Sequence, residues 1–390
     1  MKTLWLVFGW ISTESEISVI TTCAAYRYIA QCGYDIVPIY IDKSWVWYHM
    51  PSFNGQVADV VNVLKSGTWM SPLTIKPWIN GLQLSVKKAR YQSDQTMLID
   101  ILFPIMHGNG GEDGSIQWVA QMCGVPVVGP DLFTAQWTMD KHKSKILLHQ
   151  WWYPVCDYMV MTQEMLATLQ VWDIMKQFGE NVIVKPCTGG SSIGVSKCSW
   201  AEQLMKWLEL ALQFDQYVMI EPFLWWYIEV CCAVSLIDGE VRASLIEDPS
   251  RSGEVLSFDD KYSPTGWSFT GTARVPKIPA ELDPATTDRI GSTCESIYRH
   301  FAMTGTPRID FLINPQTQEL VILEINSIPG NLSMHIWWAS WVTPVQLMKS
   351  LINQAQLKQY HYEQTSVFNT SILEQCAQVG TSGGKKIWAK

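Results

Sequence analysis

The chain has 390 residues, which is long for one compact core, so we expect two or three domains. Hydrophobic residues make up 47 % and charged residues 16 %, a globular composition, and no apolar run approaches the ~20 residues that a membrane span needs. The net charge of −8 argues against a nucleic acid as partner, because binding to phosphate backbones needs clustered Lys and Arg.

The first part of the chain, residues 1–138, has the pattern of an open α/β domain. Residues 3–8 predict a buried strand, residues 18–31 a helix closed by Gly33, and residues 35–41 a second strand. A strand, a helix and a strand in this order form a βαβ unit, which is typical of α/β domains.

A glycine-rich loop interrupts the second half of this domain. The apolar stretch 97–106 predicts a further strand, and it leads into residues 107–114, which hold four glycines, one histidine and two acids. A plain turn needs fewer glycines, so we favour a substrate-binding loop over a simple turn. A helix ended by Gly124 and a short strand at 125–128 are expected to follow.

A second domain is expected over residues 139–222. Its centre is a strand, residues 181–186, in which Lys185 stands near the end, and a loop of small residues, 187–194, follows. Backbone N–H groups of such a loop can approach phosphate oxygens closely. No G-K-[ST] sequence follows the glycines, so this is not a Walker A loop, and a tight turn without function is the alternative.

The third domain, residues 223–355, alternates strands and helices, and a tail is expected at 356–390. It contains a long polar loop, residues 250–279, rich in Gly, Ser and Pro. Loops of this length in compact domains are usually functional or disordered.

Two late strands in the third domain carry a candidate metal site. Strand alternation puts Arg308 and Asp310 on one face of the first, and Glu324 and Asn326 on one face of the second. The short turn between them makes the strands antiparallel neighbours, so three oxygen ligands and a cation converge. That set suits Mg²⁺ bound to nucleotide phosphates, with a backbone N–H at Gly330 and Arg308 available to a developing oxyanion. A solvated hairpin face is the alternative.

The ten cysteines indicate a reducing compartment. No C-x-x-C pair occurs among them, and the chain start lacks a small-residue cleavage pattern. Reduced thiols and no export signal predict a cytoplasmic protein.

Together, these motifs resemble the D-alanine–D-alanine ligase family, including its vancomycin-resistance relatives that use D-serine or D-lactate. The similarity runs in order over about residues 4 to 350. The matching segments are Phe8-Gly9 with Ser12 to Ser18, His107 to Gln117, Met139-Asp140-Lys141, Lys185 to Gly194, and Asp260-Lys261-Tyr262.

The resemblance implies a three-domain ATP-grasp fold whose N-terminal part is an open α/β domain. It implies a cytoplasmic enzyme that uses ATP and two Mg²⁺ ions, with Mn²⁺ as a substitute, to join two D-alanines through an acylphosphate for peptidoglycan precursors. A homodimer is implied as well. A D-alanine–D-serine or D-alanine–D-lactate ligase is the first alternative, because the residues near 45–48 and 103–114 look more like the resistance ligases.

The resemblance also implies roles for individual residues. Catalysis would use Glu14, Ser191, Tyr262, Arg308 and Gly330; ATP would contact Lys141, Lys185, Ser192, Glu221, Leu224, Glu229 and Lys261. The amino-acid substrates would contact His107, Glu112, Ser333, His335 and Ile336, and Mg²⁺ would be held by Asp310, Glu324 and Asn326.

Several positions depart from the family pattern. Trp10 and Trp118 stand where glycine is usual, and Glu229 lies one residue further from Glu221 than expected. His335 replaces a serine that helps to bind the second substrate's carboxylate, whereas the apolar Ile336 favours D-alanine over D-serine. A weak nucleotide-binding relative with a crowded amino-acid site, and a ligase of the same superfamily with other substrates, are therefore further alternatives.

Overall fold

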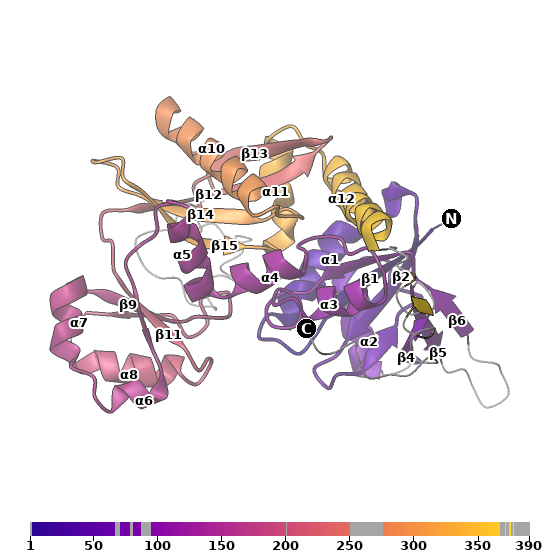
Figure 1. Ribbon diagram of the computed structural model, residues 1–390, viewed down its shortest axis with the longest axis horizontal. Helices are drawn as coiled ribbons and strands as arrows, with labels where there is room; N and C mark the ends of the chain where they lie inside the picture. Colours follow the sequence, from indigo (N-terminus) through magenta and orange to yellow (C-terminus); the bar gives the residue numbers. More distant parts are fainter. Residues whose placement is uncertain are drawn as a thin grey trace.

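Three β-sheets organise the chain (Figure 1). The computed structural model describes residues 2–66, 71–78, 81–86, 95–199, 201–249 and 276–366, with residues 371, 374, 375 and 377. Within these ranges no helix is both long and apolar enough to cross a membrane.

The N-terminal sheet has seven strands in the order β6-β5-β4-β3-β2-β1-β7, and β1 runs parallel to both β2 and β7. Its strands are β1 (Thr3–Gly9), β2 (Asp35–Ile41), β3 (Trp47–His49), β4 (Ser71–Trp78), β5 (Gly81–Val86), β6 (Gln95–Leu98) and β7 (Ile101–Ile105). The accompanying helices are α1 (Ser15–Ile29), the short 3-10 helix η1 (Ala30–Cys32), α2 (Val57–Ser66) and α3 (Ser115–Met122). The predicted βαβ unit is confirmed. Gly33 ends its helical segment, directly after η1, with a left-handed backbone at φ 82°.

Three details of the N-terminal prediction were wrong. Helix α1 begins at Ser15 rather than 18, because the Glu14 carbonyl already accepts the Ser18 N–H. The stretch 97–106 forms two strands, since Asp100 turns the chain by accepting the Thr3 N–H through its carboxylate at 2.6 Å. The expected strand at 125–128 is reduced to a single bridge between Leu102 and Val127.

The central sheet has four strands in the order β10-β9-β11-β8, with helices around it. Its elements are β8 (Met159–Met161), α6 (Gln163–Leu166), α7 (Val171–Phe178), β9 (Val182–Pro186), β10 (Ser196–Cys198), α8 (Ala201–Ala211) and β11 (Val218–Pro222). Two helices, α4 (Leu132–Met139) and α5 (Lys141–Gln150), connect the first sheet to it.

The C-terminal sheet has the order β13-β12-β14-β15, antiparallel throughout. Its elements are β12 (Ile228–Ile237), β13 (Glu240–Glu247), α10 (Pro284–His300), β14 (Arg308–Ile313), β15 (Leu320–Asn326), η2 (Gly330–Ser333), α11 (Met334–Ala339) and α12 (Pro344–Ser366). The predicted hairpin of β14 and β15 is confirmed, with Arg308 opposite Asn326 and Asp310 opposite Glu324.

Helix α12 returns to the N-terminal domain and packs beside α1 (Figure 1). Its buried residues, among them Leu347 and Leu351, share one hydrophobic cluster with Leu6 and Phe8 of β1. Because α12 continues to Ser366, the tail boundary expected at residue 355 falls inside this helix. The shared cluster fixes the N-terminal and C-terminal sheets relative to each other, with a cleft between them.

Candidate active site

A polar cleft lies where the three sheets meet. Side chains from α1, the glycine loop, α5, the 187–194 loop and the β14–β15 hairpin line it. Nine of the predicted site residues are among them: Glu14, His107, Glu112, Lys141, Ser191, Arg308, Glu324, Asn326 and Gly330. Segments more than 300 residues apart in the sequence thus contribute to one cavity.

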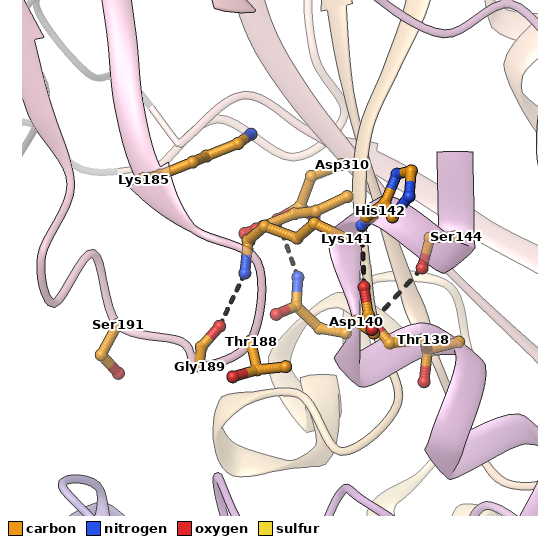
Figure 2. A network of polar contacts seen from close by, with 12 residues as sticks. Thr138, Asp140, Lys141, His142, Ser144, Lys185, Thr188, Gly189, Ser191 and Asp310 are labelled. Carbon is orange, nitrogen blue, oxygen red and sulfur yellow. Dashed lines mark hydrogen bonds and ion pairs between the residues drawn. The ribbon is translucent and has the colours of Figure 1, made fainter. Parts of the chain in front are cut away.

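Lys141 bridges two domains across the cleft. Asp140 caps helix α5 by accepting the N–H groups of His142 and Lys143 at 3.0 and 3.1 Å, which fixes Lys141 in the first turn. The Lys141 ammonium then donates to the Gly189 carbonyl at 2.6 Å and lies 3.8 Å from Glu324, as Figure 2 shows for its contact with the loop.

The 187–194 loop approaches helix α1 so closely that only small residues fit. Ser191 and Ser192 adopt left-handed backbone with φ of 52° and 59°, and the Ser191 hydroxyl donates to the Glu14 carboxylate. A Cβ at Gly190 would lie 2.9 Å from a Glu14 carboxylate oxygen. The loop is anchored at its start, where Asp215 accepts both the N–H and the hydroxyl of Thr188 at 2.6 and 2.8 Å.

Behind the cleft, Glu221 forms a buried ionic cluster with two lysines. Its carboxylate lies 2.6 Å from the Lys185 ammonium and 2.8 Å from that of Lys145. Burial alone would raise the pKa of Glu221, but Lys185 and Lys145 together lower it. Burial would likewise lower the pKa of Lys185, but Glu221 raises it, so both groups are ionised. The sequence reading missed Lys145, whose only signal is its position one helical turn after Lys141.

The β14–β15 hairpin presents a fixed guanidinium. Arg308 makes a bidentate contact to Asp310 at 2.6 and 2.7 Å, and the Asn326 amide donates to the same carboxylate at 3.0 Å. Burial would lower the pKa of Arg308, but Asp310 raises it well above its usual value. Asp310 is 2 % exposed, so its charge is balanced by Arg308, while the Asn326 amide adds a hydrogen bond.

The glycine loop brings a buried acid and a buried imidazole to the opposite wall. Glu112 accepts the N–H groups of Gly108 and Ile328 at 2.9 and 3.0 Å, while burial and the nearby Glu14 raise its pKa to about 8. The His107 ring contacts the Thr21 hydroxyl at 3.1 Å, and burial lowers the pKa of His107 to about 4. His107 is therefore a neutral ring at pH 7.

The three residues expected at the second substrate lie outside the cleft lining. His335 instead contacts Glu247 at 3.1 Å, Ile336 is fully buried, and the Ser333 hydroxyl is buried without a hydrogen-bond partner among the described residues. Asn331, Leu332 and Ser333 all have left-handed φ, near 50°, so the chain after Gly330 is strained.

The remaining predicted residues lie away from the cleft or are not described. Leu224 belongs to the turn between β11 and β12, where Tyr227 donates to its carbonyl at 3.3 Å, and Glu229 stands opposite Leu312 in β12. Lys261 and Tyr262, with most of the 250–279 loop, lie outside the described residues. Where the structure describes the chain, no three His, Cys, Asp or Glu residues form a metal cluster; the predicted set has two such acids and an amide.

The tryptophans that replace glycine do not crowd this cleft. Trp10 has φ 93° and packs edge-on against Trp45 with ring centres 4.7 Å apart. It covers Gly110, where a Cβ would lie 1.9 Å from the indole nitrogen. Trp118 is 53 % exposed, and neither tryptophan is among the described residues that line the cleft.

Two models of known protein families match this chain, one over its first part and one over its second. Residues 3–130 match the model described as D-ala D-ala ligase N-terminus, and residues 147–353 match D-ala D-ala ligase C-terminus. The chain belongs to the D-alanine–D-alanine ligase family. A D-alanine–D-alanine ligase of Thermosipho melanesiensis is 30 % identical over 375 residues, which is 96 % of this chain and 99 % of that protein. D-alanine–D-alanine ligase A of Escherichia coli K12 is 29 % identical over 90 % of this chain and 94 % of its own length.

Solved structures share the fold of this chain. The D-alanine–D-alanine ligase of Coxiella burnetii superimposes with a TM-score of 0.76 at 23 % identity, covering 98 % of this chain and 99 % of that one. The VanG D-Ala:D-Ser ligase of Enterococcus faecalis gives 0.74 at 25 % identity, covering 91 % and 99 %. The predicted ATP-grasp fold is thereby confirmed.

Proposed function

We propose that the chain joins two D-alanines to D-alanyl-D-alanine at the expense of ATP, for peptidoglycan precursor synthesis. The observation that carries this proposal is that one cleft is lined by six predicted site residues: Glu14, Lys141, Ser191, Arg308, Glu324 and Asn326. Asp310 lies next to this lining, where it accepts hydrogen bonds from Arg308 and Asn326. The cleft thus holds cations that could bind a polyphosphate, Lys141 and Arg308, together with a carboxylate that could bind an amino group, Glu14. Family membership supports the same reaction class.

The reaction would proceed in two balanced steps. A carboxylate oxygen of the first D-alanine attacks the γ-phosphorus, the bond to the bridging oxygen breaks, and ADP leaves. The deprotonated amine of the second D-alanine then attacks the acyl carbon, and the bond from carbon to phosphate oxygen breaks. Inorganic phosphate and the dipeptide result, and the protons released by the ammonium group pass to phosphate and solvent.

The residues of the chain would supply position and charge rather than covalent bonds. Glu14 would hold the first D-alanine's ammonium group, and Ser191 would orient Glu14. Arg308 and the Gly330 N–H would stabilise the oxyanion of the second step. Lys141, Lys185, Lys261, Ser192, Glu221, Leu224 and Glu229 would bind the nucleotide, Tyr262 would join Ser191 and Glu14, and His107 and Glu112 would shape the wall of the amino-acid site.

The donor set of the hairpin fits Mg²⁺. Two carboxylates and an amide supply the oxygen ligands that this ion prefers, and Asp310 already binds two hydrogen-bond donors that a cation could replace. When bound, Mg²⁺ would screen the charge of the phosphates. We propose two ions held by Asp310, Glu324 and Asn326, with Mn²⁺ as a substitute.

A second D-amino or D-hydroxy acid is the main alternative acceptor. The VanG D-Ala:D-Ser ligase covers 91 % of the chain at 25 % identity, and His335 pairs with Glu247 instead of lining the cleft as an acceptor contact. Ile336 favours D-alanine. We further propose a homodimer, a cytoplasmic location, and domains at 1–138, 139–222 and from 223 onward, the last including the whole of α12.

Product analysis tests the proposal directly. The chain is incubated with ATP and Mg²⁺ and with D-alanine alone, or with D-alanine and D-serine or D-lactate, and phosphate release is paired with mass identification of products. D-alanyl-D-alanine from D-alanine alone supports the proposal. A mixed product formed in preference moves the chain to the resistance ligases, and no turnover rejects the enzyme assignment.

A further inference from the structure

Lys145 carries a buried charge to which the proposed reaction assigns no role. Its side chain is 3 % exposed, and its ammonium lies 2.8 Å from Glu221, 3.3 Å from the Cys156 carbonyl and 5.5 Å from the centre of the Tyr158 ring. A lysine is almost never fully buried unless it is paired. Its position is therefore held by the Glu221 carboxylate.

The cluster contains one more cation than it needs for Glu221. Lys185 is 6 % exposed on its side chain and lies 2.6 Å from the other carboxylate oxygen. Either lysine alone would neutralise Glu221, so these three groups together carry a net positive charge, and Glu324 is a further carboxylate whose charge acts on Lys185. Burial of an excess charge is unfavourable unless a second anion compensates it, which a nucleotide phosphate can do.

Lys145 differs from Lys141 in what it can reach. The two residues are four apart on α5, so they lie on the same face of the helix. Lys141 lines the cleft and contacts Gly189, whereas Lys145 lies behind it against Glu221 and is not among the described lining residues. Lys141 is therefore placed for direct contact with a phosphate, whereas Lys145 contacts Glu221 behind the cleft.

We infer that Lys145 is a positioning residue that keeps Glu221 paired, so that Lys185 can turn from Glu221 to a nucleotide phosphate. This inference rests on the proposed role of Lys185 in nucleotide binding. Without Lys145, the movement of Lys185 would leave a buried carboxylate unpaired, and Lys185 would be retained by Glu221 in the free protein. With Lys145 in place, the Glu221 carboxylate keeps one ionic partner both before and after Lys185 moves.

Nucleotide binding in a double-mutant cycle tests the inference. The affinity for ADP is measured by calorimetry without D-alanine, for the unmodified chain and for K145M, E221Q and K145M/E221Q. Loss of one charged contact predicts that K145M weakens ADP binding by about tenfold or more. In turnover assays the same variant should raise the KM for ATP more than it lowers kcat. In the E221Q background the same change should have less than about a twofold effect, because no carboxylate retains Lys185.

Controls separate this role from a structural one. K143M changes a lysine of the same helix that is 66 % exposed on its side chain, and it should leave ADP binding unchanged. If K145M does not fold, E221Q and K145M/E221Q still provide the comparison, since both lack the buried carboxylate. Equal affinity of K145M and the unmodified chain, or an equal loss in both backgrounds, overturns the inference.

The two proposals fail in different ways. ADP binding that shows the expected coupling, without dipeptide formation by the unmodified chain, supports the role of Lys145 and rejects the ligase reaction. Dipeptide formation without coupling between Lys145 and Glu221 does the reverse. No ADP binding by the unmodified chain rejects both.

Discussion

Ser191 and Glu14 stand 177 residues apart in the sequence and share a hydrogen bond in which the hydroxyl of Ser191 donates to the carboxylate. Ser191 belongs to a loop of the central domain, and Glu14 directly precedes the first helix of the N-terminal domain. The bond therefore couples the 187–194 loop, which we propose lies at the nucleotide phosphates, to the proposed site of the first substrate's amino group.

Removal of this hydroxyl should impair catalysis more than folding. S191A leaves Glu14 without one donor, so the carboxylate is less well positioned, and we expect kcat/KM for D-alanine to fall roughly 10- to 100-fold. Phosphate release at varied D-alanine measures the effect, and thermal unfolding shows whether the fold is retained. S292A, at an exposed serine of α10, is the control; an S191A variant with unchanged kcat/KM would show that the contact has no catalytic role.

Arg308 should not tolerate replacement by lysine. R308K keeps the charge but loses the bidentate contact to Asp310, so we expect kcat to fall roughly 100-fold or more if Arg308 binds the oxyanion. R308M should in addition destabilise the fold by about 3–5 kcal/mol, because it leaves the buried Asp310 without its main partner. Phosphate release and urea unfolding measure these effects, with R242K on the exposed end of the same sheet as control. Near-normal kcat in R308K contradicts the role.

Much of the fold follows from local signals in the sequence. Alternation in β14 and β15 was enough to predict that Asp310 opposes Glu324, because strand geometry fixes which side chains share a face. Periodicity and Gly33 were enough for the first βαβ unit. The break at Asp100 was missed, since it depends on a hydrogen bond to Thr3, which is far away in the sequence.

The site was less predictable because burial and partners depend on tertiary packing. Lys145 looks like an ordinary surface lysine in the sequence, and only the position of Glu221 on β11 shows that it is buried. His335 was assigned to the second substrate by its place in a motif, but its ring turns to Glu247 at the end of β13. Roles for Lys261 and Tyr262 remain predictions, as they lie outside the described residues.

His107 should make stability depend on pH in the acidic range. Its pKa is lowered from 6.5 to about 4 in the folded chain, so between these values the unfolded chain takes up a proton that the folded chain does not. The free energy of unfolding therefore falls as pH drops from 6.5 to about 4, by roughly 3 kcal/mol from this group, and the contribution is fully present above pH 6.5.

Urea unfolding at a series of pH values measures this dependence. H107Q should flatten the slope between pH 6.5 and 4, whereas H149Q, at an exposed position of α5, should leave it unchanged. A slope that is the same in H107Q and the unmodified chain would mean that His107 is protonated in the folded state or is not the responsible group.

Ser333 should be a position where stability and function oppose each other. Its hydroxyl is fully buried without a hydrogen-bond partner among the described residues, and its φ of 51° is unfavourable for a residue with a Cβ. S333A should therefore raise the free energy of unfolding by roughly 1 kcal/mol, and S333G by at least as much, because glycine also adopts this φ without steric cost.

The matched control is Ser235, which is equally buried but donates to the Gly305 carbonyl at 2.8 Å. S235A should lower the free energy of unfolding by about 1–3 kcal/mol, because it removes one hydrogen bond from each of two buried groups, the Gly305 carbonyl and the Gln354 amide. If Ser333 is kept to bind the second substrate, S333A and S333G should raise KM for the second D-alanine while they stabilise the fold. If S333A lowers the free energy of unfolding, the hydroxyl has a hydrogen-bond partner in solution. If the KM for the second D-alanine stays normal, Ser333 does not belong to the substrate site.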